Sequence, residues 1–294
     1  MADIYVQIPA YRDSELPKTL RSLLAMATQA GRLRIGVFWQ RAATDRLPRT
    51  LLNHSLIEIT DIPYWQSKGC NWARSLLQQG WQGEPYTLLI DSHQRFVRGW
   101  DQLMIDQYEE LRRIGVEKPI LTGYLPPYNP VNEPHGRLHK PMEMYALRHD
   151  NGLLTKLVSY PMPFWKRLEQ PKPAHFVSLH FLFTAGQFNR EITFDPDIYF
   201  FGDEVVTSLR AYTNGYDLFH PHRVLGWHAY DRRTRTPHWN DHTAWSEQER
   251  ISSERIRALY SGHLTGPYGP GSVRSINQYE SYIYQNLISH ESAA

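Results

Sequence analysis

Short β-rich runs alternate with helix-like segments along the first 122 residues of the chain, and this alternation favours a largely parallel sheet with helices on its faces. The runs lie at residues 4–8, 34–39, 56–60, 86–90 and 119–122. After the first run, leucines from Leu16 to Leu24 recur at helical spacing, and Asp13 or Ser14 is available as the N-cap. The sequence therefore predicts an α/β fold.

Further elements are expected later in the chain. Helices are predicted at residues 72–79, 104–114, 203–213 and 250–260, and strands at residues 180–185 and 224–229, the last of them closing the sheet. Residues 123–173 are rich in proline and aromatic side chains, so we expect an ordered but irregular region that borders the functional site. We expect one domain over residues 1–290, with halves at 1–122 and 123–290.

The strand predicted at residues 86–90 runs directly into Asp91-Ser92-His93. In an extended chain, residues two apart point to the same side, so Asp91 and His93 can converge on one ion. A carboxylate beside an imidazole suits Mn²⁺ or Mg²⁺ bound together with a phosphate-bearing substrate. Sheets of this class bind ligands at the carboxyl ends of their strands. The alternative is an ordinary polar turn after a strand.

Three other features have both a functional and a structural reading. Asp203 and Glu204 start a predicted helix, where carboxylates can act chemically or simply cap the helix. His228 ends an apolar run, where it can bind a metal or only a hydrogen-bond partner. Arg74 follows a turn that contains a glycine, and it can bind a diphosphate or sugar, or lie exposed on its helix.

Composition restricts the class of protein. The net charge of +2 is too balanced to suggest a nucleic acid or an anionic membrane as partner, so we expect neither. The single Cys70 excludes a disulfide framework, and we find neither a signal-peptide pattern nor an apolar run of membrane-spanning length. We therefore expect a cytoplasmic protein without a membrane span.

An ordered set of motifs resembles the cytosolic polypeptide N-acetylglucosaminyltransferases, which modify hydroxyproline, and their bacterial relatives. The set comprises residues 8–13 (Ile-Pro-Ala-Tyr-Arg-Asp), 68–74, 90–96 (Ile-Asp-Ser-His-Gln-Arg-Phe), 201–204 (Phe-Gly-Asp-Glu), 227–232 (Trp-His-Ala-Tyr-Asp-Arg) and 268–274 (Tyr-Gly-Pro-Gly-Ser-Val-Arg). Asp-Ser-His is also similar to the motif of the more distant polypeptide N-acetylgalactosaminyltransferases. The resemblance implies a GT-A fold, a Rossmann-like mostly parallel sheet flanked by helices.

The resemblance also implies residue roles. It implies that Asp91, His93 and His228 are ligands of a divalent metal, Mn²⁺ or Mg²⁺. It implies contacts with a UDP-sugar for Ile8, Pro9, Tyr11, Arg12, Gln40, Arg74, Asp91 and Ser92. Asp203, Glu204 and Arg74 would be the catalytic residues beside the sugar or the acceptor.

The implied reaction is the metal-dependent, retaining transfer of N-acetylglucosamine from UDP-GlcNAc to a hydroxyl of a peptide or protein. A bound cation stabilises charge on the leaving diphosphate. Same-face attack is favoured, while double displacement through Asp203 or Glu204 stays open. A glycan or small-molecule acceptor, or a non-catalytic binding module on this fold, are the alternatives. A metal-dependent phosphoesterase is disfavoured because the second carboxylate of its Gly-Asp-x-x-Asp motif is absent after Gly202-Asp203.

Overall fold

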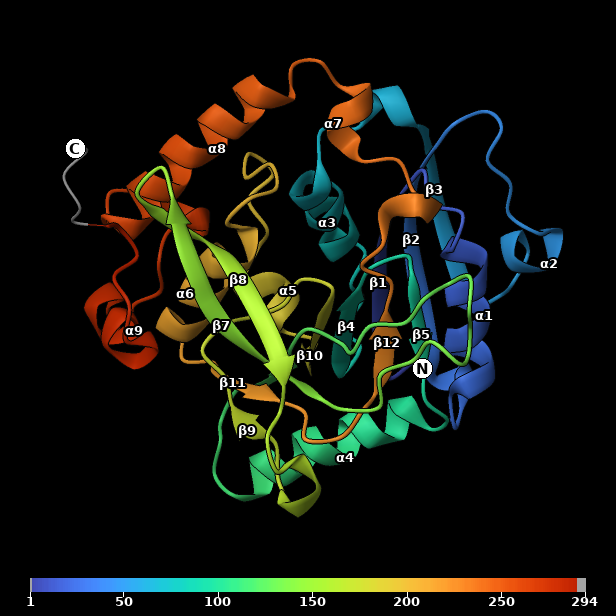
Figure 1. Ribbon diagram of the computed structural model, residues 1–294, viewed down its shortest axis with the longest axis horizontal. Coiled ribbons are helices and arrows are strands. Elements are labelled where there is room, and N and C mark those ends of the chain that lie inside the picture. The colour runs from blue at the N-terminus through green and yellow to red at the C-terminus, as the bar shows by residue number, and fades with distance from the viewer. Residues whose placement is uncertain (1, 290–294) are drawn as a thin grey trace.

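The computed structural model describes residues 2–289 of the chain. Within this range, eight strands form one sheet in the order β3-β2-β1-β4-β10-β6-β11-β9 (Figure 1). The strands are β1 (Ile4–Tyr11), β2 (Leu33–Arg41), β3 (Ile57–Pro63), β4 (Tyr86–Ile90), β6 (Pro119–Thr122), β9 (Lys172–Pro173), β10 (Phe181–Ala185) and β11 (Asp217–His220). The strands from β3 to β4 run parallel, as do β6 and β11, whereas β10 and β9 run antiparallel to their neighbours. The predicted mostly parallel α/β architecture is confirmed.

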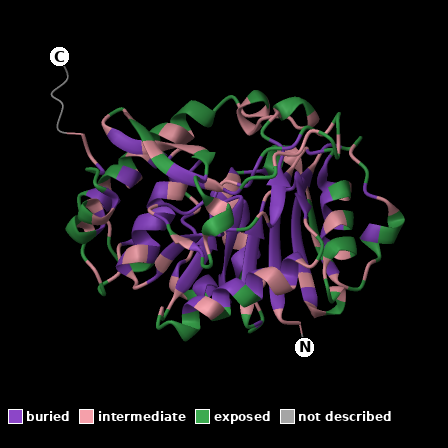
Figure 2. Cartoon of the chain, turned by 60° about the horizontal axis from the view of Figure 1, so that its bottom comes forward, coloured by how far each residue is buried: buried purple, intermediate pink, exposed green. Residues whose placement is uncertain are grey.

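Helices cover both faces of this sheet, and the apolar residues between them are buried (Figure 2). The helices are α1 (Leu16–Met26), α2 (Arg49–Leu52), α3 (Cys70–Gln79), α4 (Trp100–Arg113), α5 (Phe188–Glu191), α6 (Asp203–Thr213), α7 (His238–Asp241), α8 (Trp245–Tyr260) and α9 (Ile276–Ile283). Alternate residues of β1 pack with α1 and α4. The opposite face of the sheet carries α3 beside β2, and α5 and α6 farther along. This two-sided cover explains why the central strands read as continuous apolar runs.

Two small sheets lie outside the main one. Strand β5 (Gln94–Phe96) pairs with β12 (Gly226–His228), so that His228 lies opposite Gln94 in the register. Strands β7 (Met142–Asp150) and β8 (Leu153–Pro161) form a hairpin, which packs against α6, α8 and α9. In Figure 1 the hairpin crosses in front of α6 and β10.

The prediction that residues 123–173 are irregular is wrong where the β7–β8 hairpin forms. The prolines of this region lie before residue 142 and after residue 160, so residues 142–160 contain no proline and can form the hydrogen bonds of two paired strands. Asn151 and Gly152 connect the strands, both with positive φ (51° and 74°). An Asn-Gly pair between β-rich segments is a strong signal for a two-residue hairpin turn, so this hairpin was readable from the sequence.

Two further predictions are corrected. The run at residues 224–229 does not close the main sheet, because its strand β12 pairs with β5 in a separate two-stranded sheet. The last described strand of the chain that joins the main sheet is β11. Helix α1 has Glu15 at its N-cap position and no side-chain cap, so neither Asp13 nor Ser14 caps it. The carboxylate of Asp13 is instead occupied by Ser92, His93 and the Glu15 amide. The single domain over residues 1–290, whose end residues 1 and 290 lie outside the described range, stays a prediction.

Candidate metal centre and cleft

The carboxyl ends of β1, β2 and β4 meet at one edge of the sheet. Tyr11 lies opposite Gln40 in the parallel register of β1 and β2, and Asp91 follows the last residue of β4. Because the three strands run parallel, their following loops face the same space. Ser92 and His93 form a bend there, so Asp91 and His93 approach each other through a bend and not along an extended strand as the sequence suggested.

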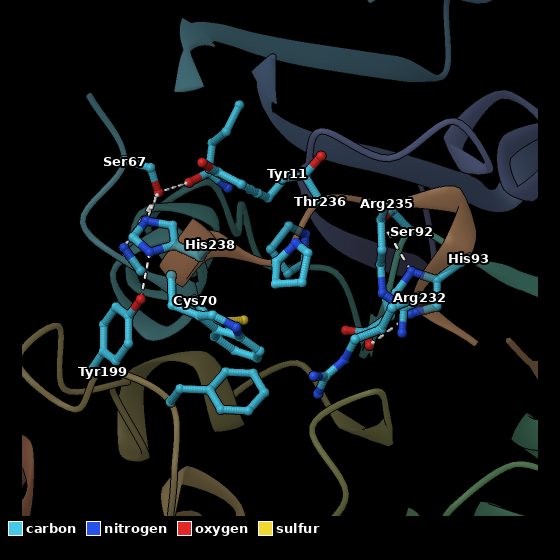
Figure 3. Close-up of a pocket in the computed structure, with 17 residues that line it drawn as sticks. Tyr11, Ser67, Cys70, Ser92, His93, Tyr199, Arg232, Arg235, Thr236 and His238 are labelled. Carbon is cyan, nitrogen blue, oxygen red and sulfur yellow. Dashed lines mark hydrogen bonds and ion pairs between the residues drawn. The ribbon is translucent and has the colours of Figure 1, made fainter. Parts of the chain in front are cut away.

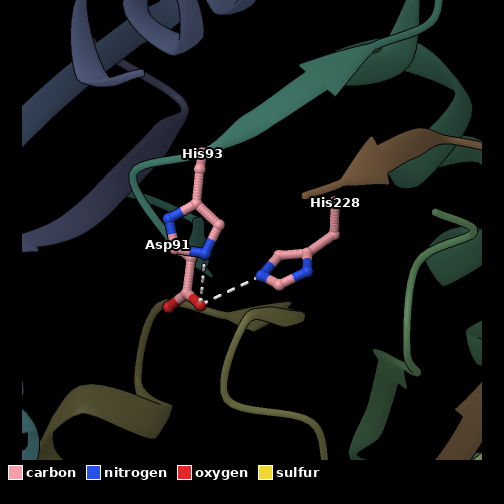
Figure 4. Close-up of side chains that lie close together, drawn as sticks. All are labelled: Asp91, His93 and His228. Carbon is pink, nitrogen blue, oxygen red and sulfur yellow. Dashed lines mark hydrogen bonds and ion pairs between the residues drawn. The ribbon is translucent and has the colours of Figure 1, made fainter. Parts of the chain in front are cut away.

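Asp91, His93 and His228 form a cluster whose ligand atoms all lie within 4.8 Å of one another (Figure 4). Oδ2 of Asp91 lies 3.2 Å from Nε2 of His228 and 3.4 Å from Nε2 of His93. His228 comes from β12, which the pairing with β5 carries next to the Asp-Ser-His bend. The structure thus brings together three side chains that are up to 137 residues apart in sequence.

The protonation states of Asp91 and His228 suit the binding of a cation. Burial raises the pKa of Asp91, but the hydrogen bond with His228 and the nearby imidazole of His93 outweigh burial and hold that pKa well below its usual range. Burial lowers the pKa of His93, yet contacts with Asp13 and Asp91 raise it overall. Burial lowers the pKa of His228 to about 4, which leaves its imidazole neutral near pH 7, the form that binds metals.

The residues of this cluster fit a divalent cation. Nε2 of His93 is buried and has no hydrogen-bond partner among residues 2–289, although it faces the carboxylate of Asp91. An unpartnered buried acceptor is costly unless an ion or water completes it. One carboxylate and two imidazoles are ligands that Mn²⁺ accepts, and three protein ligands leave coordination positions for a substrate.

A cleft opens beside the cluster (Figure 3). It is lined by Pro9, Tyr11, Gln40, Ser67, Gly69, Cys70, Asp91, Ser92, His93, Tyr199, Phe200, Arg232, Arg235, Thr236, Pro237, His238 and Trp239. Two cations, Arg232 and Arg235, therefore face the same space as the carboxylate of Asp91. A mixture of aromatic rings, cations and a carboxylate suits a ligand that combines a base or sugar with phosphate groups.

One wall of the cleft is the segment of residues 232–241, which crosses the end of β1. The main chain of Asp13 forms a β-bridge with Arg235, and the amide of Ser14 donates to the carbonyl of Thr234 (3.0 Å). In α7, the carboxylate of Asp241 accepts hydrogen bonds from the Tyr11 hydroxyl (2.6 Å) and from Arg12 Nη1 (2.7 Å). These contacts fix the segment over the strand ends.

A chain of hydrogen bonds runs along another part of the cleft. The Ser67 hydroxyl donates to Oε1 of Gln40 and lies 3.0 Å from Nε2 of His238. Nδ1 of His238 lies 2.6 Å from the Tyr199 hydroxyl. Figure 3 shows Ser67, His238 and Tyr199 in line. This chain orients Gln40, the one member of it that the sequence had singled out.

Arg74 and the acidic pair at the start of α6 form a second cluster, in which Arg74 and Asp203 are buried and Glu204 is partly buried. Nη1 of Arg74 donates to Asp203 (2.7 Å) and to Asn71 (2.9 Å). Glu204 accepts from the Tyr124 hydroxyl (2.6 Å) and from the amide of Leu179 (3.0 Å). Burial, followed by the charge of Asp203, raises the pKa of Glu204 to about 7. Burial also raises the pKa of Asp203, although Arg74 opposes that shift.

The structure places part of the predicted set around the cleft and part outside it. Lining residues among the predicted ones are Pro9, Tyr11, Gln40, Asp91, Ser92 and His93, with His228 against Asp91. Ile8 is instead fully buried in the apolar core beneath the strand end. Arg12 reaches Asp241, while Arg74, Asp203 and Glu204 do not line the cleft. The functional roles of all these residues stay predictions.

No role was predicted from the sequence for any residue of the wall at residues 232–241. Arg235, Pro237, His238 and Trp239 had no role assigned, and neither did Tyr199 or Phe200. A signal was present, because arginines and aromatic residues follow directly after the third candidate ligand. Their approach to β1 depends on tertiary contacts that no local pattern encodes.

The comparison with protein families identifies the class. The sequence model of the Glycosyltransferase (GlcNAc) family matches residues 3–52 and 46–287. Those two matches together span the strand ends, the cluster and the cleft. The chain belongs to this glycosyltransferase family. The finer resemblance to the hydroxyproline-modifying enzymes stays a prediction.

Solved glycosyltransferase structures share the fold of this glycosyltransferase chain. GalNAc-T7, crystallised with UDP, GalNAc and Mn²⁺, superposes with a TM-score of 0.58 at 13% identity, over 96% of this chain and 55% of that one. The chain thus spans about half of the GalNAc-T7 structure. Residues 1–349 of TarS from S. aureus with UDP-GlcNAc give a TM-score of 0.53 at 13% identity, over 96% and 70% of the two chains. The fold is GT-A.

No curated protein sequence matches the chain. Among residues 2–289, no helix combines the length and apolar character that a membrane crossing requires.

Proposed function

We propose that this chain transfers N-acetylglucosamine from UDP-GlcNAc to a hydroxyl of a peptide or protein acceptor, in a metal-dependent reaction that retains the anomeric configuration. The observation that carries the proposal is the cluster of Asp91, His93 and His228 at the mouth of a cleft lined by strand ends. The GlcNAc in the name of the matching family and the UDP-GlcNAc bound to TarS favour this donor. The Mn²⁺ bound to GalNAc-T7 favours a similar ion.

Under this proposal the cleft holds the donor. Tyr11 and Gln40 lie at the ends of neighbouring strands, where the nucleoside would bind. Arg232 and Arg235 would attract the diphosphate, since guanidinium groups match phosphate oxygens in both charge and geometry. A divalent cation held by the cluster would supply charge stabilisation to the departing diphosphate. Pro9 and Ser92 also line the cleft, and they would contact the donor between its nucleoside and its diphosphate.

The proposed mechanism is same-face attack, in which the leaving phosphate accepts the proton of the acceptor hydroxyl. A covalent route would need a free carboxylate beside the sugar. Asp203 is instead paired with Arg74, and Glu204 is held by Tyr124 and the amide of Leu179. Neither carboxylate lines the cleft. The contacts of this acidic pair therefore favour a role in shaping the site over a role as nucleophile.

The acceptor is proposed to bind on the side of the β7–β8 hairpin. Thr155 of β8 packs against Gly202, at the turn that leads into Asp203. Tyr145, Leu147 and Tyr160 expose apolar surface on the hairpin. Exposed aromatic and aliphatic side chains of this kind are suited to a polypeptide ligand. A glycan or small molecule is the alternative acceptor, and the cytoplasmic location stays a prediction.

A donor screen tests this proposal. The purified protein is incubated with Mn²⁺ and each common UDP-sugar, and slow UDP release is recorded without acceptor. We expect UDP from UDP-GlcNAc in preference to UDP-galactose and UDP-glucose, and none after chelation. The configuration of the released or transferred sugar, read by proton NMR before mutarotation, would be α for a retaining enzyme. Absence of both binding and hydrolysis for every UDP-sugar would contradict the proposed function.

A further inference from the structure

Asp13 lies directly behind the candidate metal cluster, where no capping or surface role accounts for all of its contacts. Its side chain is 1% exposed. Oδ2 accepts a hydrogen bond from the Ser92 hydroxyl (2.6 Å) and lies 2.7 Å from Nδ1 of His93. Oδ1 accepts a hydrogen bond from the amide of Glu15 (2.9 Å). One carboxylate therefore contacts both residues that follow Asp91.

The main chain around Asp13 is held as firmly as its side chain. The amide of Arg12 donates to the carbonyl of Gln40 (3.0 Å), which extends the pairing of β1 and β2. On the other side, Asp13 forms its β-bridge with Arg235. A side chain that starts from a backbone fixed on both sides has little freedom to follow its partner. The position of the carboxylate thus determines the position of the imidazole.

The contacts of Asp13 determine which nitrogen of His93 carries the hydrogen. A carboxylate only accepts hydrogen bonds, so Nδ1 of His93 must be the donor at 2.7 Å. In the neutral imidazole, a hydrogen on Nδ1 leaves the lone pair on Nε2. Nε2 is the atom that faces Oδ2 of Asp91 at 3.4 Å and has no hydrogen-bond partner among the described residues.

We propose that Asp13 is a positioning residue for the metal site: it holds His93 with hydrogen on Nδ1 and turns the Nε2 lone pair toward Asp91 and His228. The inference rests on the proposed metal-dependent function, which it deepens. Carboxylate–imidazole–metal arrangements fix the ring and its tautomer, and loss of such a partner weakens metal binding by about 10- to 100-fold. Asp13 does not line the cleft, so it would act through His93 and not on the substrate itself.

Asp13→Asn is the discriminating substitution, because asparagine keeps the size of the side chain and replaces one oxygen by a donor. If the amide nitrogen takes the place of Oδ2, it faces Nδ1 of His93 and forces the hydrogen onto Nε2. If it takes the place of Oδ1, it faces the amide of Glu15, donor against donor. Neither orientation satisfies all three neighbours that aspartate satisfies.

Asp101→Asn is the matched control. Asp101 is also buried, and its two oxygens accept hydrogen bonds from the amides of Thr28 (2.7 Å) and Gln29 (3.1 Å). It contacts neither the cluster nor the cleft. Asp101→Asn therefore reports the cost of removing a buried carboxylate acceptor in this fold, without any change at His93.

The first experiment titrates Mn²⁺ into the full chain without donor and follows free ion by electron paramagnetic resonance. We expect Asp13→Asn to bind Mn²⁺ about 10- to 100-fold more weakly than wild type, and Asp101→Asn to bind within about twofold of wild type. Wild-type affinity in Asp13→Asn would overturn the inference. An equal loss of affinity in both variants would overturn it as well, because the effect would then be one of stability.

The second experiment keeps the inference testable if Asp13→Asn does not fold or wild type binds no Mn²⁺. Long-range ¹H–¹⁵N correlation spectra of metal-free wild type, with histidine labelled and His93 assigned by comparison with His93→Asn, report the tautomer directly. Hydrogen on Nδ1 of His93 is the expected result, and hydrogen on Nε2 alone would overturn the inference. Absence of Mn²⁺ binding with the expected tautomer would contradict the proposed function and leave the Asp13–His93 relationship standing.

Discussion

Nη1 of Arg74 donates a hydrogen bond to Oδ2 of Asp203 at 2.7 Å, which joins helix α3 to the first turn of helix α6 across 129 residues of sequence. Both side chains are buried, at 6% and 12% exposure. Each buried charge would be costly without the opposite charge of its partner. This pair lies close to Asp91, whose charge also acts on both partners.

Asp203→Asn tests whether that pair is structural. The substitution leaves Arg74 as a buried cation without its counter-charge, so we expect a loss of about 3–5 kcal/mol in the free energy of unfolding, measured by urea denaturation. Asp195→Asn is the comparison, because its partner Arg255 is 25% exposed and should depend less on the pair. A stable Asp203→Asn protein that no longer transfers sugar would instead place Asp203 among the reacting groups.

Glu204→Gln should change how stability depends on pH. The folded protein holds the pKa of Glu204 at about 7, above the ordinary 4.5, so it binds a proton more tightly than the unfolded chain does. Stability from this group is present below about pH 4.5 and is lost as pH rises through about 7. Between pH 5 and pH 8, the free energy of unfolding of Glu204→Gln, measured by thermal denaturation, should therefore exceed that of wild type by on the order of 1–2 kcal/mol. If the stability of the two proteins changed with pH in the same way, the pKa of Glu204 would not be raised in the folded protein.

Asp241→Asn should loosen the segment that crosses the cleft. Asp241 accepts hydrogen bonds from Tyr11 and Arg12, and asparagine can accept from both only with a weaker, uncharged oxygen. We expect UDP to bind about tenfold more weakly by calorimetry, equivalent to about 1.4 kcal/mol. Asp231→Asn, a change at a partly exposed carboxylate that pairs with Arg233 and lies just before the segment, serves as control. Equal or tighter UDP binding by Asp241→Asn would show that the segment does not form part of the binding site.

Arg232 and Arg233 are neighbours in sequence that differ in their relation to the cleft. Arg232 lines it, whereas Arg233 is 66% exposed and pairs with Asp231. Arg232→Ala should raise the Kd for UDP about tenfold and make that Kd less sensitive to salt, since a phosphate contact is removed. Arg233→Ala should bind UDP as wild type does. Equal effects in the two variants would show that Arg232 acts only through the general charge of the surface and not through a specific phosphate contact.

Local pattern was enough to predict the elements on which the site depends. Strand β4 at residues 86–90 and helix α6 at residues 203–213 have the predicted bounds, because a compact apolar run and a helical repeat determine each one locally. The convergence of Asp91 and His93 was also predicted from sequence, although the two residues meet through a bend and not along an extended strand. The approach of His228 was inferred by resemblance alone, since it depends on the pairing of β12 with β5.

The remainder of the cleft depends on long-range contacts. His238 reaches the cleft through its contacts with Ser67 and Tyr199, and Asp13 reaches His93 across 80 residues. The sequence pattern favours Asp13 as a helix cap, because an aspartate before a helix has that role in many proteins. The β7–β8 hairpin is different, since its Asn151-Gly152 turn was present in the sequence and was overlooked.

The most direct test of the metal cluster is UDP release from UDP-GlcNAc, measured with and without Mn²⁺ in wild type, Asp91→Asn and His228→Ala. His220→Gln is the matched control, because His220 is equally buried but binds the amide of Met144 and the carbonyl of Thr122 away from the cluster. We predict Mn²⁺-dependent release by wild type and His220→Gln, lost on chelation, and only background release by the two cluster variants. Release at the wild-type rate by both Asp91→Asn and His228→Ala would contradict the account.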